Sequence, residues 1–264
     1  MTLALIAGNG ALPAAIVAAL NVRPLVCVFE GCAPDGLQPD LTFRLETLGS
    51  LLQALSEQGV TEVCFAGALA RPQLDPSKLD ALTAPLVPMM LAALQKGDDG
   101  ALRVILDLFE TRGFALRAAH DLAPDLLIRD GILTVVQPDA QMRADADVGA
   151  AHIALMGPRD IGQACVVAGG EVRGMEDSTG TDALMSREAA ALAGTRAILF
   201  KGPKPDQSRL VDLPTIGPDT VRNAINAGLV GIVVDAGEVL MLEPQKCRAI
   251  ADAAGLVIWA RTSA

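Results

Sequence analysis

Short apolar runs alternate with segments of helical spacing in the first part of the chain. Residues 3–7, 24–31 and 61–67 are apolar runs typical of buried strands. Residues 13–20 and 45–59, which lie between these runs, have apolar side chains at helical spacing. Strands that alternate with helices in this way predict a parallel sheet with right-handed crossovers. The N-terminal region is therefore predicted to be a parallel-sheet α/β domain.

A long apolar stretch follows the third predicted strand. Residues 86–112 are predicted to be helical, with a break around residues 96–100. The run at residues 86–94 is uniformly apolar, which favours packing in the core. The alternative is an acyl-chain groove lined by Met89 and Met90.

A second α/β region begins after a change in the pattern. Residues 120–145 are rich in Asp, Pro and Gly, which is typical of a boundary or a connecting hairpin. We therefore predict one domain over residues 1–130 and a second α/β domain over residues 131–264. The second domain is expected to contain a helix at 145–156, a hairpin around Gly169-Gly170, strands at 196–200, 228–235, 238–242 and 256–260, and helices from Pro218 and Pro244.

Residues 1–22 carry no charged side chain, which raises the alternatives of a secretion signal and a membrane anchor. A signal peptide needs a positively charged start, whereas the first Arg in this chain is Arg23. A transmembrane helix needs about 20 apolar residues, and Gly8, Asn9, Gly10 and Pro13 interrupt this segment. We therefore interpret it as the first strand, loop and helix of the α/β domain.

The composition supports a folded core and excludes one class of partner. Apolar residues make up 51% of the chain and charged residues 20%, which indicates a globular protein. The chain has a net charge of −10. Nucleic-acid binding needs a basic surface, so no nucleic-acid partner is expected. The five Cys residues are irregularly spaced and fit no zinc site, which favours a reducing cytoplasm.

A glycine-containing turn follows the first predicted strand and precedes the first predicted helix. The small residues of Gly8-Asn9-Gly10 allow backbone N–H groups to approach an anion at a helix N-terminus. Glu30 ends the second strand, where a dinucleotide-binding fold places its ribose-binding acid. However, Pro13 replaces the third Gly of that motif. The turn is a candidate for binding a nucleotide-type ligand, and a purely structural turn is the alternative.

The end of the third predicted strand has a similar composition. Gly67 allows the close approach of a ligand, and Arg71 is a candidate to reach an anion. Ligands in open α/β sheets bind at the carboxyl ends of the strands. A simple transition from strand to loop explains the same residues equally well.

Charged side chains gather in the second half of the chain. Thr181 and Asp182 lie at a predicted helix start, where either residue would be an N-cap in the simpler interpretation. Lys201, Lys204 and Asp212 lie in a segment stiffened by prolines. Lysines suit the neutralisation of a diphosphate, and carboxylates suit Mg²⁺. The sequence therefore favours a phosphoryl-chemistry site here over a solvated surface loop.

The absence of other motifs narrows the chemistry. His120 and His152 are the only histidines, so a His-rich binuclear metal site cannot be assembled. The chain also lacks a P-loop, a GxSxG nucleophile motif and an HExxH zinc motif. A phosphohydrolase with this sequence would rely on carboxylates.

Several of these segments together resemble one known family. They are LIAGNGALP, FAGALARP, KGDD, RDIGQACVV, GTDA, and K-x-x-K-P-x-Q followed by VDLPTIG. In this order they resemble the histidine-poor LpxI family of UDP-2,3-diacylglucosamine pyrophosphatases of Gram-negative lipid A synthesis. The resemblance implies a Rossmann-like N-terminal domain, a C-terminal α/β domain and a ligand cleft between them. It also implies Mg²⁺-dependent hydrolysis of the diphosphate to UMP and 2,3-diacylglucosamine 1-phosphate (lipid X).

The resemblance also implies roles for individual residues. Asp212 matches the essential aspartate of the family and is expected to bind the metal or to position the attacking water. Asn9 stands where a further Gly is common in the family, and Asp235 stands where Glu is usual, which leaves any role of Asp235 in doubt. The expected substrate-binding residues are Gly8, Asn9, Gly10, Ala66, Gly67, Gln163, Thr181, Asp182, Lys201 and Lys204.

The expected partners follow from the same resemblance. A lipid-linked sugar nucleotide as substrate implies transient contact of a cytoplasmic enzyme with the inner-membrane surface, and the sequence leaves open whether the protein is a homodimer. Two other functions remain as alternatives. Glu30 and the glycine turn would suit an NAD-dependent oxidoreductase, and the same ligand features would suit a non-catalytic sugar-nucleotide or lipid-binding protein.

Overall fold

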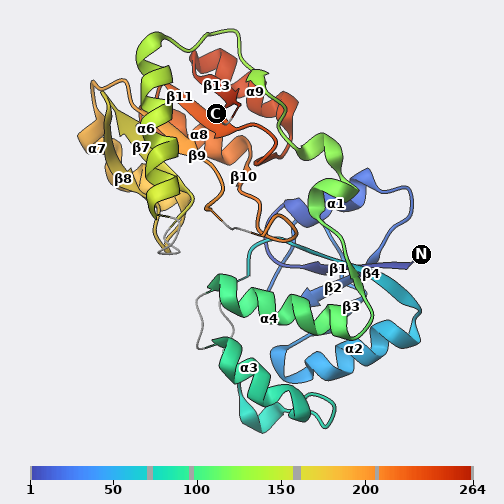
Figure 1. Ribbon diagram of the computed structural model, residues 1–264. Coiled ribbons are helices and arrows are strands. Elements are labelled where there is room, and N and C mark those ends of the chain that lie inside the picture. The colour runs from blue at the N-terminus through green and yellow to red at the C-terminus, as the bar shows by residue number, and fades with distance from the viewer. Residues whose placement is uncertain (1, 70–73, 95–97, 157–161, 206–207, 263–264) are drawn as a thin grey trace. The chain divides into compact units, whose positions relative to one another are not determined.

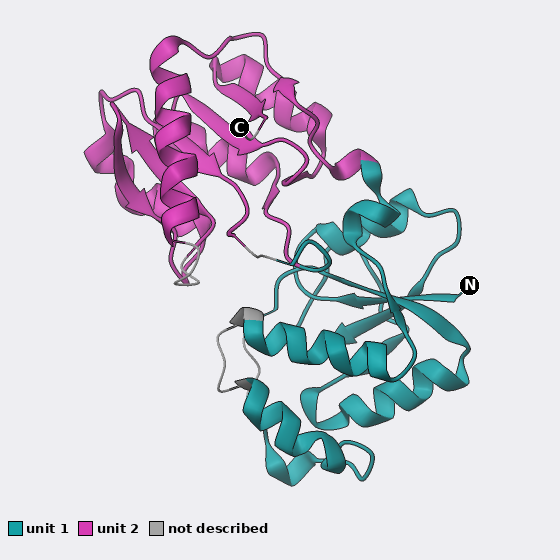
Figure 2. Ribbon diagram, viewed as in Figure 1, with its two compact units in different colours: residues 1–124, 208–211 teal, residues 125–207, 212–264 magenta. Residues whose placement is uncertain are grey.

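The computed structural model describes residues 2–69, 74–94, 98–156, 162–205 and 208–262 (Figure 1). It divides into two compact units (Figure 2). Unit 1 comprises Met1–Pro124 and Ser208–Val211, and unit 2 comprises Asp125–Gln207 and Asp212–Ala264. The units therefore divide after Pro124 instead of after residue 130, and residues 208–211 belong to the first unit and not the second.

Unit 1 contains a five-stranded sheet in the order β3-β2-β1-β4-β5. Neighbouring strands are parallel throughout this sheet, which confirms the expected α/β class. The short strands β3 and β5 were not predicted. The strands are β1 (Thr2–Ala7), β2 (Leu25–Phe29), β3 (Leu41–Phe43), β4 (Val60–Ala66) and β5 (Ala115–Leu116).

The helices of unit 1 bury an aliphatic core that contains a few Phe rings. Leu52 and Phe109 pack with Ile6 of the sheet in one cluster of buried side chains. Pro13 lies in the first turn of α1, as predicted. The helices are α1 (Leu12–Ala19), α2 (Leu48–Glu57), α3 (Val87–Leu94), α4 (Asp98–Thr111) and α5 (Ala119–Leu122), with 3₁₀ turns at Leu45–Thr47, Pro76–Lys78, Ala84–Leu86 and Pro124–Leu126.

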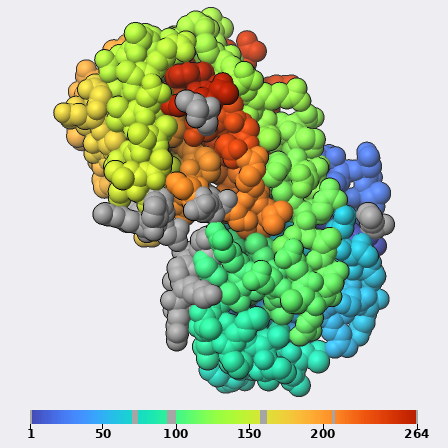
Figure 3. Space-filling model, in the orientation of Figure 1, coloured from blue at the N-terminus to red at the C-terminus, as the bar shows by residue number. Residues whose placement is uncertain are grey.

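Helix α3 packs its two methionines into unit 1. Met90 is 1% exposed, and Met89 packs against the same cluster of buried residues. This confirms the core interpretation for both side chains and leaves no support for a groove lined by them. Leu82 and Leu91 remain 46% and 48% exposed. The surface over α3 and α4 is visible in teal and green in Figure 3.

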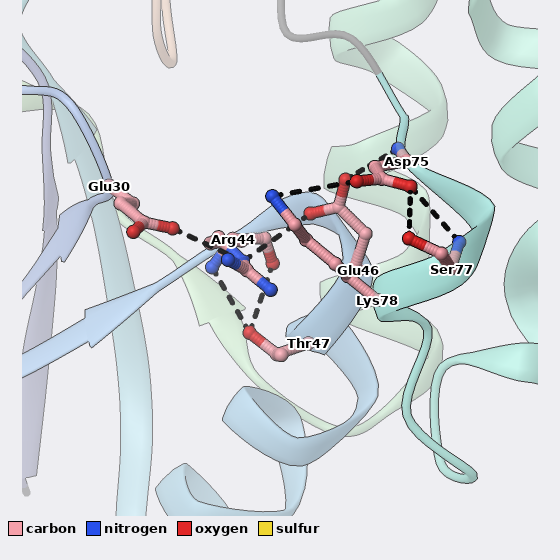
Figure 4. Close-up of polar contacts among 7 residues, drawn as sticks. All are labelled: Glu30, Arg44, Glu46, Thr47, Asp75, Ser77 and Lys78. Carbon is pink, nitrogen blue, oxygen red and sulfur yellow. Dashed lines mark hydrogen bonds and ion pairs between the residues drawn. The ribbon is translucent and has the colours of Figure 1, made fainter.

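Polar contacts fix the segment that leads into α3. The Glu46 side chain accepts a hydrogen bond from the backbone N–H of Asp75 at 2.7 Å (Figure 4). The backbone N–H of Asp80 donates to the Glu46 carbonyl at 3.1 Å. The backbone N–H of Gly49 donates to the Thr83 hydroxyl at 2.8 Å. Because Glu46 and Thr83 are buried, these bonds hold the segment firmly against the start of α2.

Unit 2 contains a six-stranded mixed sheet in the order β6-β13-β11-β9-β7-β8. Strands β9, β11 and β13 are parallel, and β6, β7 and β8 are antiparallel to their neighbours. The strands are β6 (Gly131–Ile132), β7 (Ala164–Ala168), β8 (Glu171–Met175), β9 (Ile198–Lys201), β11 (Gly231–Asp235) and β13 (Val257–Arg261). A separate parallel pair joins β10 (Thr215–Ile216) to β12 (Leu240–Met241).

The predicted hairpin around Gly169-Gly170 is confirmed by the antiparallel pairing of β7 with β8. The fully buried Asp145 side chain accepts bonds from the backbone N–H groups of Gly169 and Gly170 at 3.1 and 2.6 Å. The alternative hairpin in residues 120–145 is wrong, because β6 pairs with β13 near the other end of the chain. That stretch is instead where the chain passes from unit 1 to unit 2.

Helices cover both faces of the unit 2 sheet (Figure 1). Helix α6 (Ala140–Met156) packs with Phe200 and Val233 on one face. Helices α7 (Thr181–Leu192), α8 (Pro218–Asn226) and α9 (Pro244–Ala254) pack with Leu199 and Val234 on the other face. Within the described ranges, no helix is both long enough and apolar enough to cross a membrane.

Candidate functional site

The carboxyl edge of the parallel strands in unit 2 brings distant segments together. Strand β9 ends at Lys201, which is in register with Val234 of β11 and with Ala164 of the antiparallel β7. Gln163 therefore lies beside the end of β9, and the backbone N–H of Gly202 donates to its carbonyl at 3.1 Å. Glu176 follows the end of β8 at the same edge, since its backbone N–H donates to the Ala164 carbonyl at 2.9 Å. Ligands of α/β sheets bind at such edges.

Lys201 is a buried cation at the centre of this edge. Its side chain is 6% exposed, and its Nζ donates a hydrogen bond to the Thr181 hydroxyl at 2.8 Å. Burial lowers the pKa of Lys201, and the nearby carboxylates of Glu176, Asp182 and Asp212 act in the opposite direction. Three acidic side chains therefore act electrostatically on one buried ammonium group.

Thr181 and Glu176 connect Lys201 to the backbone of Gln163. The Thr181 hydroxyl donates to Glu176 Oε1, and the backbone N–H of Gln163 donates to Glu176 Oε2 at 2.7 Å. The structure thus brings three predicted site residues (Gln163, Thr181 and Lys201) together through one residue that was not predicted. In these bonds Gln163 takes part through its backbone.

The N-cap interpretation of Thr181 and Asp182 is wrong. Helix α7 begins at Thr181, so the N-cap position falls on Gly180, which has φ +89° and makes no side-chain capping bond. Both predicted residues therefore lie inside the first turn of α7. There the Thr181 hydroxyl is hydrogen-bonded to Lys201 and Glu176. The Asp182 carboxylate is exposed and acts electrostatically on the Lys201 ammonium group.

Asp212 is the first residue of unit 2 after the segment Ser208–Val211. Its side chain is half-buried and contributes to the field on Lys201. Two residues further along, the carbonyl of the buried Pro214 accepts a bond from the backbone N–H of Leu240 at 2.8 Å. This bond fixes the backbone close to Asp212. Lys204 is half-buried three positions after Lys201.

The donor groups determine what kind of metal site is feasible. Among the residues that the structure describes, no three His, Cys, Asp or Glu side chains are grouped closely enough to hold a metal ion. Mg²⁺ usually keeps several waters and binds through one or two carboxylates together with substrate phosphates. Asp212 and Asp182 both act on the Lys201 ammonium group. One or two such carboxylates fit a Mg²⁺ site that is completed by waters and substrate phosphates. They do not fit a metal held by protein ligands alone.

The glycine turn after β1 is bonded to the loop after β4. The backbone N–H of Gly8 donates to the Ala66 carbonyl at 2.8 Å, and that of Asn9 donates to the Ala68 carbonyl at 2.7 Å. The Asn9 side chain accepts a bond from the backbone N–H of Ala33 at 2.8 Å. The backbone N–H groups of Gly8 and Asn9 are thus bonded within the protein, and anion binding by the Gly8-Asn9-Gly10 turn stays a prediction. A role for the turn in lining the substrate site stays a prediction.

Gly67 allows a close approach, but the approaching group is the glycine turn itself. A Cβ atom at Gly67 would lie 2.8 Å from the Asn9 carbonyl oxygen, and one at Gly8 would lie 2.5 Å from the Ala68 carbonyl oxygen. The two backbone segments are thus too close for any side chain at either glycine. Gly10 and Ala66 belong to the same pair of loops, and Arg71 lies outside the described residues.

Glu30, the candidate ribose-binding acid, forms an ion pair. Its carboxylate lies 3.1 Å from Arg44 Nε, and the two side chains point toward one another (Figure 4). Arg44 also lies 3.7 Å from the buried Glu46. The guanidinium group is thus between two carboxylates at the ends of β2 and β3. The structure gives Glu30 this partner, which weakens the case for a dinucleotide-binding acid.

Asp235, whose role was left in doubt, lies at the same edge of unit 2 but on the other face of the sheet. It is in register with Arg261, and its carboxylate lies 3.6 Å from the Nε of that residue. Arg261 also donates to the Ala146 carbonyl of α6 at 3.1 Å. Lys201 packs on the side of Leu199, and Asp235 on the side of Val233, because side chains alternate along a strand.

The fold and the charged edge define a two-unit α/β protein with a site suited to a phosphorylated ligand. Family models support a closer assignment: the LpxI N-terminal domain matches residues 2–126 and the LpxI C-terminal domain matches residues 129–259. The chain is also 36% identical, over 97% of its length and 96% of the relative's, to UDP-2,3-diacylglucosamine pyrophosphatase LpxI of Caulobacter vibrioides. The chain belongs to the LpxI family.

Proposed function

We propose that this chain hydrolyses the diphosphate of UDP-2,3-diacylglucosamine to give UMP and 2,3-diacylglucosamine 1-phosphate in lipid A synthesis. The observation that carries the proposal is the 36% identity, over nearly the whole of both chains, to a protein named for this substrate. The buried Lys201 with its surrounding carboxylates supplies charges that this reaction can use. The ion pair of Glu30 with Arg44 counts against the oxidoreductase alternative.

Each charged residue has a distinct part in the proposed mechanism. The diphosphate of the substrate becomes more negative at the leaving phosphate as the P–O bond breaks, and a fixed cation there stabilises the transition state. Lys201 is that cation, because burial removes the water that would otherwise screen it. Lys204, which is half-buried, binds the ground-state diphosphate.

Asp212 is the proposed ligand of Mg²⁺ and orients the attacking water. Bound Mg²⁺ would supply charge neutralisation for the phosphate oxygens and acidify a bound water. The fixed backbone near Pro214 holds the Asp212 carboxylate in place for either task. The Asp182 carboxylate adds negative charge that attracts the cation to this position.

The proposed location follows from the substrate. A diacylated sugar nucleotide resides in a membrane, so the enzyme contacts the inner-membrane surface transiently from the cytoplasm. The five free thiols are consistent with that reducing compartment. The substrate-binding roles of Gly8, Asn9, Gly10, Ala66 and Gly67, and a ligand cleft between the two domains, belong to the same proposal.

Release of UMP from UDP-2,3-diacylglucosamine tests the function directly. The wild-type chain with Mg²⁺ should release UMP, and EDTA should stop the release until Mg²⁺ is added back. The Asp212→Asn variant should lose turnover, while Asp219→Asn should not, because Asp219 pairs with Arg222 on the surface of α8. Tight substrate binding without UMP release at any metal concentration would instead identify a non-catalytic binding protein.

A further inference from the structure

Glu176 is a buried carboxylate whose two oxygens are both occupied. Its side chain is among the buried acidic groups, with an exposure of 7%. Oε1 accepts a bond from the Thr181 hydroxyl, and Oε2 accepts one from the backbone N–H of Gln163. A backbone N–H can only donate, so Oε2 must accept.

The bonds in this series of contacts run from Lys201 to Thr181 and from Thr181 to Glu176. A threonine hydroxyl has one proton, and in Thr181 that proton points to Glu176. The Thr181 oxygen is then left as an acceptor toward Lys201, whose ammonium group can only donate. Glu176 thus determines which way the Thr181 hydroxyl faces, and the hydroxyl determines where the Lys201 ammonium group lies.

The backbone around Glu176 is built closely enough to keep it in place. The backbone N–H of Glu176 is bonded to Ala164 at 2.9 Å. Gly162 has φ +56°, and a Cβ atom there would lie 2.3 Å from the Glu176 carbonyl oxygen. The backbone N–H and the carbonyl group of Glu176 are therefore both held by neighbouring backbone segments. Because the Thr181 hydroxyl bonds to both Glu176 and Lys201, the position of Glu176 restricts the position of the Lys201 ammonium group.

We propose that Glu176 is a positioning residue that, through the Thr181 hydroxyl, holds the Lys201 ammonium group in the orientation needed to stabilise the transition state. The inference rests on the proposed function, because it assigns Lys201 to the diphosphate. Glu176 itself does not touch the substrate. Its negative charge also favours the protonated form of Lys201, which burial disfavours.

The conservative change Glu176→Gln reverses the bond between residue 176 and Thr181. A glutamine accepts at one terminal atom and donates at the other, and the Gln163 N–H requires the acceptor. The amide NH₂ then donates to the Thr181 oxygen, so the Thr181 hydroxyl proton loses its acceptor and the hydroxyl must turn, which displaces Lys201. We expect kcat to fall about 100-fold, as for loss of one preorganised donor, with KM changed less than about 3-fold.

Thr181 supplies a test that does not depend on the folding of the Glu176 variant. Thr181→Val keeps the shape and removes the hydroxyl, so it should lower kcat to a similar degree. Thr181→Ser keeps the hydroxyl and should retain kcat within about 3-fold of the wild type. The double variant Glu176→Gln/Thr181→Val should lose no more than the single variants, since both break the same chain.

Matched controls come from the same hairpin and loop. Glu171→Gln removes an exposed carboxylate of β8 that pairs with Arg173, and Thr179→Val removes an exposed hydroxyl that donates to Asp177. Both should leave kcat unchanged. Folding of each variant is checked by its urea midpoint.

The outcomes separate this inference from the proposed function. Wild-type turnover together with full activity of folded Glu176→Gln and Thr181→Val would overturn the positioning role alone. An additive loss in the double variant, or no rescue by serine, would overturn it as well. Absence of UMP release by the wild type would overturn the proposed function and this inference together.

Discussion

Lys201 donates a hydrogen bond to Thr181 across 2.8 Å, although the two residues are twenty positions apart in the chain. The bond joins the end of a central strand to the first turn of a helix that packs on the same face of the sheet. It orients a buried cation that has three carboxylates around it.

The two lysines of the site should differ in kinetic effect. Lys201 is buried and Lys204 is half-buried, so water screens the second cation more strongly. Lys201→Met should lower kcat about 100-fold, whereas Lys204→Met should mainly raise KM. Steady-state UMP release measures both constants. Lys246→Met, which removes an exposed ion pair with Glu243 on α9, is the control. Equal effects of the two site variants would contradict the assignment.

Gly67→Ala should destabilise unit 1 more than Gly10→Ala does. Both residues have positive φ, +95° and +90°, which costs an Ala about 1–2 kcal/mol. Only at Gly67 would the new Cβ lie 2.8 Å from the Asn9 carbonyl oxygen, and such overlap adds about 1–3 kcal/mol. Around Gly10 the described atoms leave open space. Urea unfolding compares the two variants, and equal midpoints would show that the turns are not packed together.

The anchoring of the segment before α3 should depend on pH through Asp80. Burial by itself raises the pKa of Asp80, but bonds from the Ser50 hydroxyl, Thr83 and Leu82 outweigh it and lower that pKa below its ordinary value. A lowered carboxyl pKa adds stability that is present above the unfolded pKa of about 3.9 and is lost as pH falls through the folded value.

Asp80→Asn should therefore lower the free energy of unfolding by about 2 kcal/mol at pH 7. The difference from the wild type should shrink below about pH 4. Urea unfolding at several pH values measures this difference, and Asp107→Asn on the exposed side of α4 is the control. A difference that persists unchanged at pH 3 would contradict the role of the charge.

Cys32 should be the one thiol that reacts quickly in the folded protein. Cys32 is half-buried, and the other four cysteines are buried. Burial raises the pKa of Cys27, Cys64 and Cys165 to about 12, which leaves almost no thiolate at pH 8. A disulfide reagent should release one equivalent of product rapidly and all five after denaturation. Cys32→Ser should remove the rapid phase, and its persistence would place reactivity at another cysteine.

The apolar pattern predicts most of the fold because each main strand and helix is long enough to show its period. β2 and β11 lie within the predicted runs, and β1, β4, β9 and β13 each extend one residue beyond theirs. β3 was missed because its three residues are too few for a period, and pairing with Cys27 of β2 decides its place. The misassigned hairpin in residues 120–145 has the same cause, since β6 has two residues and its partner β13 is far away in the sequence.

The site was predicted in its composition but not in its connections. Residue type and spacing identified Lys201, Thr181 and Asp212. Glu176 was not identified, because nothing in its local sequence distinguishes it from a surface glutamate at the end of a hairpin. Its importance arises from the packing of the α7 start beside the hairpin end. The glycine turn shows the converse, because the sequence does not reveal that the backbone N–H groups of Gly8 and Asn9 are bonded to the Ala66 and Ala68 carbonyls.

The polypeptide passes between the two units three times. The polypeptide enters unit 2 at Asp125, returns to unit 1 for Ser208–Val211, and re-enters unit 2 at Asp212. No single cut can separate the two units, since a fragment from residue 125 onward would carry four residues that belong to unit 1. One peptide bond joins Val211 of unit 1 to Asp212 of unit 2. The proposed catalytic carboxylate thus belongs to the residue at which the chain re-enters unit 2.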